Sequence, residues 1–400
     1  MPKPYFFFRP LLAKNHVWAA FDWQTNKPET AEATDYTRCF DESGVAPLAR
    51  KNPLIMPAAP AWLEHSEFIQ KLDANQAIFV LPAETLEDAA TIDRCKTLRK
   101  RGHHCALQVE NAEIIKRIPV AAFDYLQFDA AFVRHQLPAS ALEYADAAGF
   151  HKIARHVDAR ELFEWLAGKN FALCGSGFVT ALAPNAGKEP DLTRLKLLKL
   201  LSLVAQDADT REIEEIFREE PKLSYNLLRL VNSVAVGAKA TIGSFHQAIA
   251  ILGRRQLQRW LQLLIYANQV THTSIPSPLL QLAAARGRQM ELLVGAIEPP
   301  INIPDFGDTA FMTGIFSLLE VLLNLPMNQI LDALPLQKEI HDALSARQGI
   351  LGHLLDAITA GEAGNFSGAA ETLTQLGISP TRHTMAQTAA FFWAGGINLE

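Results

Sequence analysis

One stretch of this 400-residue chain, residues 221–261, constrains the fold more than any other. Its first part carries apolar side chains at the spacing of a helix with a single buried face. These side chains are Leu223, Leu227, Leu230, Val231 and Val234. Pro221 suits the first turn of such a helix, because a missing backbone N–H costs nothing there. The stretch therefore begins with a predicted amphipathic helix.

Two further helices are predicted in the same stretch. Ser244 and Gln247 have the spacing of a capping box, which opens a helix. Gly253 is placed to end that helix, since glycine adopts the left-handed conformation at little cost. A third helix follows, with its apolar residues on one side: Leu257, Trp260, Leu261 and Leu264. We expect three short helices packed on one another.

This pattern resembles the HDOD domain, a helical relative of the HD phosphohydrolases. The resemblance is carried by residues 223–225, 227–233, 242–244, 248–253 and 259–261. Most of these are core or turn residues, so they indicate a fold rather than a chemistry. The resemblance implies a core helix over residues 313–320, in which Ser317 and Leu318 replace a catalytic His and Asp. The dipeptide His341-Asp342 lies on a polar helix, and we expect it on a solvated face.

Composition limits the class of protein. The net charge of −6 gives no electrostatic argument for a nucleic-acid or membrane surface. The four cysteines form no C-x-x-C pair, which favours a reduced, intracellular protein. No apolar run approaches the roughly 18 residues of a membrane-spanning helix. We expect a soluble, cytoplasmic protein that does not bind nucleic acid.

The first half of the chain has a different pattern from the second. Short apolar runs predict strands at residues 5–8, 17–23, 54–57, 77–81, 105–109, 125–129, 152–157 and 171–178. Helical patterns between several of them favour a parallel sheet with covering helices, and eight strands favour a (β/α) barrel. A turn-rich segment at 183–190 then ends the strand signal. We predict an α/β barrel domain at 1–185 and an all-helical domain at 191–400.

This order of domains resembles the EAL–HDOD signalling proteins, in which a cyclic di-GMP phosphodiesterase fold precedes an HDOD domain. The resemblance implies a degenerate EAL domain. The E-A-L-x-R signature falls on residues 19–23, so Ala19 replaces the metal-binding Glu and Trp23 the phosphate-contacting Arg. The other site positions of the family also carry different residues here. Gln108 and Val109 replace the paired aspartates, Gln127 replaces a Lys, Arg155 replaces a Glu, and Cys174-Gly175 replaces Gln-Gly.

Few groups remain that could ligate a hard divalent cation, which takes oxygen ligands, carboxylates above all. Valine cannot ligate, and a cation at Arg155 would repel the metal. The acids Asp22 and Asp129 remain, and we expect them to be solvated at strand ends. We therefore expect no enzymatic activity, no metal site and no cofactor.

The sequence favours a non-catalytic scaffold that binds other signalling proteins or a second copy of itself. The suggested interaction surface lies in the HDOD-like stretch, at Asn232, His246 and Arg255. We expect the small basic cluster of Arg254, Arg255 and Arg259 to be solvated. The alternatives are a cyclic di-GMP receptor, disfavoured by the missing signature Arg, and a phosphodiesterase with an atypical metal site.

Overall fold

The computed structural model describes residues 3–65, 67–182, 245–267, 277–334 and 336–397, together with a few single residues and pairs between 199 and 232. The chain divides into two compact units. Unit 1 comprises Met1–Ala181, Gly361–Ala370 and Pro380–Thr388, and unit 2 comprises Leu182–Ala360, Glu371–Ser379 and Ala389–Glu400. The predicted fold class, an α/β barrel followed by helices, is confirmed.

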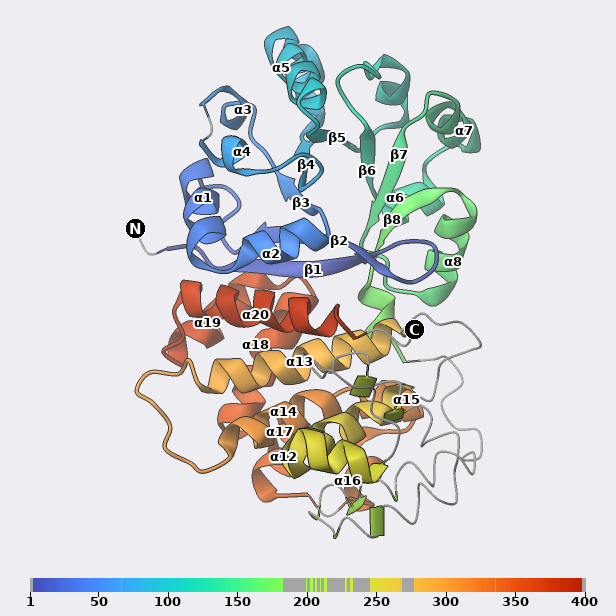
Figure 1. Cartoon of the computed structure of the whole chain (residues 1–400). Coiled ribbons are helices and arrows are strands. Elements are labelled where there is room, and N and C mark those ends of the chain that lie inside the picture. Colours follow the sequence, from blue (N-terminus) through green and yellow to red (C-terminus); the bar gives the residue numbers. More distant parts are fainter. Residues whose placement is uncertain are drawn as a thin grey trace. The chain divides into compact units, whose positions relative to one another are not determined.

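Unit 1 is built on a closed barrel of eight strands in sequence order (Figure 1). The strands are β1 Phe6–Leu12, β2 Trp18–Thr25, β3 Leu54–Pro57, β4 Ala77–Leu81, β5 His104–Val109, β6 Tyr125–Asp129, β7 His151–Arg155 and β8 Phe171–Gly175. Each overlaps a strand predicted from the sequence. The expectation of a parallel sheet is wrong for β1, which pairs antiparallel with both β2 and β8. A short turn joins β1 to β2, and only antiparallel strands can be joined in this way.

Helices follow most of the strands and alternate with them along the chain (Figure 1, blue to green). They are α1 Ala33–Glu42, α2 Val45–Lys51, α3 Trp62–His65, α4 Glu67–Lys71, α5 Ala89–Lys100, α6 Ala130–His135, α7 Ala139–Ala147 and α8 Arg160–Gly168, with short 3-10 helices at Ala83–Glu87, Ala112–Arg117 and Gly177–Thr180. Small and branched side chains fill the barrel: Leu11, Ala20, Ile55, Ile78, Val80, Ala106, Ile153 and Leu173. The barrel is therefore a packed core and not a pore.

The C-terminal part of the chain also contributes to unit 1, beyond the predicted boundary of 1–185. Phe366, which begins α19 (Phe366–Gln375), stacks on Phe7 with ring centroids 5.0 Å apart. On α20 (Pro380–Ala394), the Gln387 side chain accepts from Phe8 N at 3.0 Å and donates to Phe8 O at 3.4 Å. These segments cover part of β1 and satisfy its backbone.

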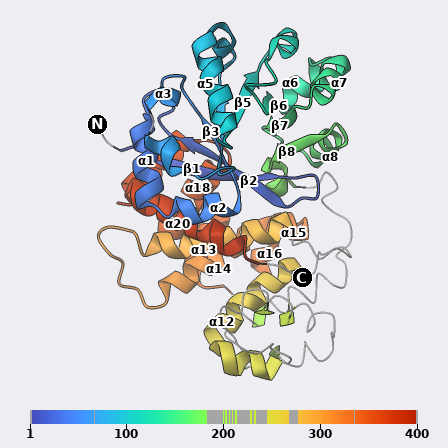
Figure 2. The ribbon, with the colours of Figure 1, turned by 45° about the horizontal axis from the view of Figure 1, so that its top comes forward.

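Unit 2 is helical in the part that the structure describes. Its helices are α12 Phe245–Ala267, α13 Pro278–Val294, α14 Phe306–Phe316, α15 Leu319–Leu323, α16 Met327–Asp332, α17 Lys338–Ala346 and most of α18 Gly349–Glu362. Gly253 has a φ of 74° and separates α12 into two pieces, which can be followed in yellow in Figure 2. The predicted stop at Gly253 and the buried face of the following helix are confirmed. The predicted helix at 221–234 lies almost wholly outside the described residues.

Helices α13 and α14 pack closely because two glycines face each other. A Cβ on Gly314 would lie 2.6 Å from the Gly287 Cα. The helix expected at residues 313–320 is interrupted, since α14 ends at Phe316 and α15 begins at Leu319. By length and composition, Phe306–Leu323 could cross a membrane, but 61% of it is buried within the structure and a core helix passes the same test.

Candidate functional site

The carboxyl-terminal ends of the barrel strands form the mouth of the barrel, where barrel proteins place their sites. Neighbouring strands bring Gln108 of β5 opposite Gln127 of β6, and Asp129 of β6 opposite Arg155 of β7. The two glutamines and Arg155 line a cavity of about 720 Å³, together with Gln24 at the end of β2. These four strand-end side chains therefore present three carboxamides and one guanidinium to the cavity.

Aromatic side chains line the same cavity. Tyr36 on α1 and Trp62 on α3 both border it, with ring centroids 5.1 Å apart. Trp62 is half-buried, and Tyr36 is buried beneath it. Tyr36 keeps its hydroxyl proton, because burial, followed by the charges of Cys39 and Asp22, raises the pKa of its phenol. The cavity thus combines an apolar ring surface with hydrogen-bonding amides.

A second cavity of about 270 Å³ shares Gln108, Gln127 and Arg155 and adds Asp129 and His156. His156 Nδ1 lies 2.7 Å from Asp129 Oδ2, and Asp129 Oδ1 accepts from two N–H groups at the start of α6. Burial raises the pKa of Asp129, but the hydrogen bonds from His156 and the helix outweigh it and hold the pKa below its usual value. Asp129 is half-exposed, and it is held by this dyad rather than free in solvent.

Asp22 is the other acid expected at a strand end, and the expectation that it is solvated is wrong. It is only 3% exposed, because cross-strand pairing with β1 places Arg9 beside it. Its Oδ2 lies 2.7 Å from Arg9 Nη2, and its Oδ1 accepts from Gln24 Nε2 at 2.7 Å. Both carboxylate oxygens are therefore already bonded.

The residue at the signature position also differs from expectation. Trp23 packs on Phe8 on the opposite face of β2 and does not line the cavity. The alternation of β2 instead puts Ala20, Asp22 and Gln24 on the face of Asp22, with Ala20 in the barrel core. Gln24, and not Trp23, is therefore the residue of this part of β2 that lines the cavity.

The mouth does not fit the divalent cations that an EAL phosphodiesterase uses. Such cations need several oxygen ligands, chiefly carboxylates. Here Asp22 is bonded to Arg9, and Asp129 to His156 and α6. In the described part of the chain, no three His, Cys, Asp or Glu side chains are grouped so that they could hold a metal ion. We derive no metal-dependent step from this mouth.

Arg155 differs from the arginines around it. Its side chain is half-buried and its Nε is shielded from solvent. The guanidinium has no hydrogen bond or ion pair with any residue that the structure describes. The mouth therefore holds one positive charge that the described protein does not neutralise.

In unit 2, the residues that resemble a phosphohydrolase site have structural partners. Ser317 donates to Gly314 O at 2.7 Å and accepts from Arg286 Nη1 at 2.7 Å, so its hydroxyl fixes the end of α14. His341 is half-exposed on α17, and Asp342 pairs with Lys338, as expected for a solvated helix face. These contacts bring together no groups for hydrolysis.

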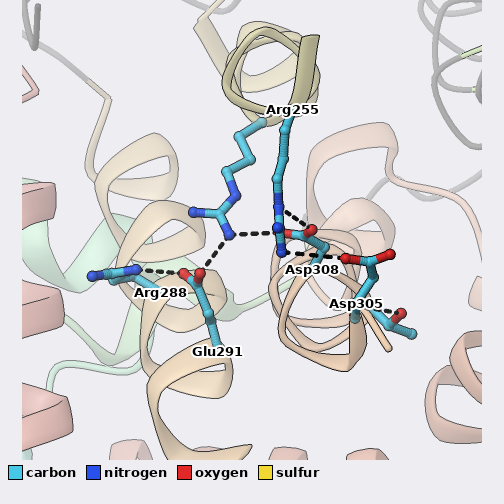
Figure 3. Close-up of polar contacts among 7 residues, drawn as sticks. Arg255, Arg288, Glu291, Asp305 and Asp308 are labelled. Atoms are coloured by element: carbon cyan, nitrogen blue, oxygen red, sulfur yellow. Dashed lines mark hydrogen bonds and ion pairs between the residues drawn. The ribbon is translucent and has the colours of Figure 1, made fainter. Parts of the chain in front are cut away.

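The suggested interaction residues are only partly described. Asn232 is half-buried and has partners within the chain, and the side chain of His246 lies outside the described residues. Arg255 is 61% exposed and forms ion pairs with Asp308 and, at 3.7 Å, with Asp305 (Figure 3). The structure brings Arg255 together with these two acids.

Arg259 belongs to the same network of ion pairs. Its Nη2 contacts Glu291 of α13 and lies 2.6 Å from Asp308 Oδ1 of α14. Its guanidinium also lies 4.9 Å from the centre of the Phe311 ring. The expectation of solvated arginines is wrong for Arg259, whose side chain is only 15% exposed among its acidic partners, and it holds for Arg255, whose side chain is 61% exposed.

Comparison with known proteins identifies one region of the chain. Residues 193–316 match the family model of the HDOD domain. The chain therefore carries an HDOD domain, and the helices α12 to α14 lie in or overlap the matched region.

Two curated relatives extend the similarity. The chain is 24% identical over 309 residues to the uncharacterized protein YuxH of Bacillus subtilis (strain 168), covering 74% of each chain. It is 28% identical over 192 residues to the cyclic di-GMP phosphodiesterase CdgJ of Vibrio cholerae. That match covers 48% of this chain but only 43% of CdgJ. With the HDOD match, it confirms the predicted resemblance to the EAL–HDOD signalling proteins.

Solved structures of EAL proteins are also similar to part of the chain. The match to the structure of the cGMP-bound EAL enzyme Bd1971 has 11% sequence identity and a TM-score of 0.36. It covers 43% of this chain and 61% of the Bd1971 chain. The match to the crystal structure of the EAL domain of Mycobacterium smegmatis DcpA has 15% sequence identity and a TM-score of 0.36. It covers 44% of this chain and 91% of the DcpA chain. The barrel itself is defined by the pairing of its eight strands.

Sequence reasoning missed several residues of the mouth. Gln24 follows from the alternation of β2 once its inner face is known. His156 and Asp129 lie 27 residues apart, and no local pattern joins them. Trp62 belongs to a four-residue helix, which is too short to give a periodic signal.

Proposed function

We propose that the chain is a non-catalytic signalling protein, related to the proteins of cyclic di-GMP signalling, which acts by binding a regulator protein or a second copy of itself. The observation that carries this proposal is the chemistry of the barrel mouth. Gln24, Gln108, Gln127 and Arg155 line it. The buried acid beside them, Asp22, is paired with Arg9.

The proposal follows from what a phosphodiesterase needs. A divalent cation activates the attacking water and stabilises the charge that develops on the phosphate oxygens. Neutral carboxamides are weak substitutes for carboxylates as ligands of such a cation. An unneutralised guanidinium at the same mouth repels it. A fold that keeps its core and changes its ligands in this way is suited to recognition rather than to hydrolysis.

Turnover of cyclic di-GMP tests the proposal. We expect no hydrolysis by the full chain with Mg²⁺ or Mn²⁺, measured by chromatography of the products beside an active EAL phosphodiesterase. The Arg155→Glu variant, which restores one acid, is also expected to be inactive, because one carboxylate does not make a metal site. Hydrolysis by the wild-type chain that EDTA abolishes would refute the non-catalytic assignment.

A further inference from the structure

Helix α20, drawn in red in Figure 1, has the composition of a buried helix but keeps one face exposed. Arg382 is the one charged residue among its 15 residues when histidine is counted as neutral. A helix that is apolar all round is normally covered on all sides. Met385 is nevertheless 50% exposed and Phe392 49% exposed. Because large apolar side chains that share an exposed surface mark sites of protein interaction, this face of α20 is a candidate interaction surface.

The exposed residues of α20 lie on one stripe of the helix. They are Arg382, Met385, Ala389 and Phe392, and the other residues of the helix are buried or partly buried. Successive members are three, four and three residues apart, which is the spacing at which one helix packs along another. We call these four residues the α20 stripe. Its spacing predicts that the partner is also a helix.

Contacts on the opposite face hold the α20 stripe in place. Gln387 bonds both backbone groups of Phe8, and Thr388 Oγ1 donates to Ser43 O at 2.9 Å. All four of these residues are buried. The bonds fix the rotation of α20 about its own axis, so the stripe needs no rearrangement to bind a partner.

The α20 stripe is complementary to a second copy of itself when two α20 helices pack antiparallel. One antiparallel register places the large Met385 against the small Ala389 of the other copy, so that the side chains interdigitate. The same register places the Arg382 guanidinium against the Phe392 ring of the other copy, whose π-face attracts a cation. Parallel helices would instead bring two Arg382 side chains together, and like charges repel. Each stripe residue therefore has a complementary partner, and two-fold symmetry forms each contact twice.

We propose that the chain forms a homodimer through the α20 stripe, with the two α20 helices antiparallel. This inference rests on the proposed function and deepens it, because it specifies the partner as a second copy of the chain. The stripe spans only about 15 Å of helix. The interface is therefore small, and the dimer is of the weak kind whose population depends on protein concentration.

Sedimentation equilibrium of the full chain, from about 1 to 100 µM, tests this proposal. We expect a mass that rises with concentration from 44.1 kDa towards twice that value. Ala389→Arg fills the space that Met385 of the other copy needs and adds a cation near its Arg382, so the dimer should weaken about 100-fold. Ala147→Arg is the matched control, because Ala147 is an exposed alanine at the end of α7 and lies outside the stripe. Its dimer should be as strong as that of the wild type.

Cysteine cross-linking tests the register without a disruptive variant. The four native cysteines are buried and do not compete. Diamide, a thiol oxidant, should join Met385→Cys chains to Ala389→Cys chains, because the antiparallel register places these two positions opposite each other. Arg382→Cys chains should not cross-link, because the two copies of residue 382 lie about 15 Å apart in this register, beyond the reach of a disulfide.

A wild-type chain that stays at 44.1 kDa at the highest concentration would overturn the proposal. A dimer that is as strong in Ala389→Arg as in Ala147→Arg, or efficient cross-linking of Arg382→Cys, would also overturn it. Hydrolysis of cyclic di-GMP is assayed on the same samples to separate the two proposals. Turnover by a dimer would refute the non-catalytic assignment and leave the interface standing, whereas an inactive monomer would refute the interface alone.

Discussion

Two partly buried arginines show how the two units of this protein differ. In unit 2, Arg259 is held by Glu291, Asp308 and the ring of Phe311. In unit 1, Arg155 lies among carboxamides, with no bonded partner in the described chain. The first arrangement uses the charge to join three helices, whereas the second leaves the guanidinium unpaired among the described residues. Pairing, rather than burial, therefore distinguishes these two arginines.

The largest effect is expected where the pairing is tightest. Arg259→Met removes the cation that joins Glu291 to Asp308 and leaves these acids with Arg288 and Arg255 alone, so it should destabilise the helical unit by about 3 kcal/mol. Denaturant unfolding followed by circular dichroism measures this loss. Arg255→Met is the matched control, because its side chain is 61% exposed and the expected loss is below about 1 kcal/mol. Equal losses in the two variants would contradict the central role of Arg259.

A buried base with no counter-charge extends the comparison to pH. Burial lowers the pKa of His383 from 6.5 to about 4, where the ring packs against Tyr5 and Phe7. As the pH falls, the unfolded chain therefore binds a proton on His383 before the folded protein does. The contribution of the neutral ring to the free energy of unfolding is complete above pH 6.5 and is lost as the pH falls towards 4. The loss amounts to about 3 kcal/mol. Stability measured between pH 7 and 4 should fall less steeply for His383→Phe than for the wild type, and identical slopes would refute the assignment.

Unit 1 has a paired arginine of its own, which should behave as Arg259 does on a smaller scale. Asp22→Asn keeps the size of the side chain but removes the negative charge beside Arg9. We expect a loss of about 1–3 kcal/mol in the unfolding free energy, because Arg9 stays largely buried without its counterion. Glu87→Gln is the control, since its ion pair with Arg117 is exposed. A loss in Glu87→Gln as large as in Asp22→Asn would contradict this account.

The smallest effect is expected at Arg155 itself. Because its guanidinium stabilises no described group, Arg155→Gln should change the unfolding free energy by less than about 0.5 kcal/mol. A large loss of stability would show that Arg155 is a structural residue like Arg259, and the comparison between the two arginines would fail.

The strands of the barrel could be predicted from the sequence because each is a short apolar run with turn residues around it. Their directions could not, since hydropathy is the same for parallel and antiparallel strands. The five residues between Leu12 and Trp18 were the available signal for the antiparallel pair, because so short a connection fits a hairpin. The contribution of Gln387 to β1 was out of reach, since its partner Phe8 lies 379 residues away.

Part of the candidate site could be predicted from the sequence. Gln108, Gln127 and Arg155 were named because the resemblance to EAL domains implies site residues at these positions, and all three line the mouth. The partners that determine their chemistry, such as Arg9 for Asp22 and His156 for Asp129, depend on cross-strand neighbours. Sequence reasoning therefore locates the residues of a barrel mouth but not which of their charges are neutralised.

The central claim is that this barrel mouth does not hold a divalent metal ion. Electron paramagnetic resonance of free Mn²⁺, titrated with the full chain, tests it most directly, because bound Mn²⁺ loses its sharp aqueous signal. The account predicts that an equal concentration of protein leaves the signal unchanged, in the wild type and in Asp22→Asn alike. Loss of one Mn²⁺ signal per chain, restored by Asp22→Asn, would contradict it.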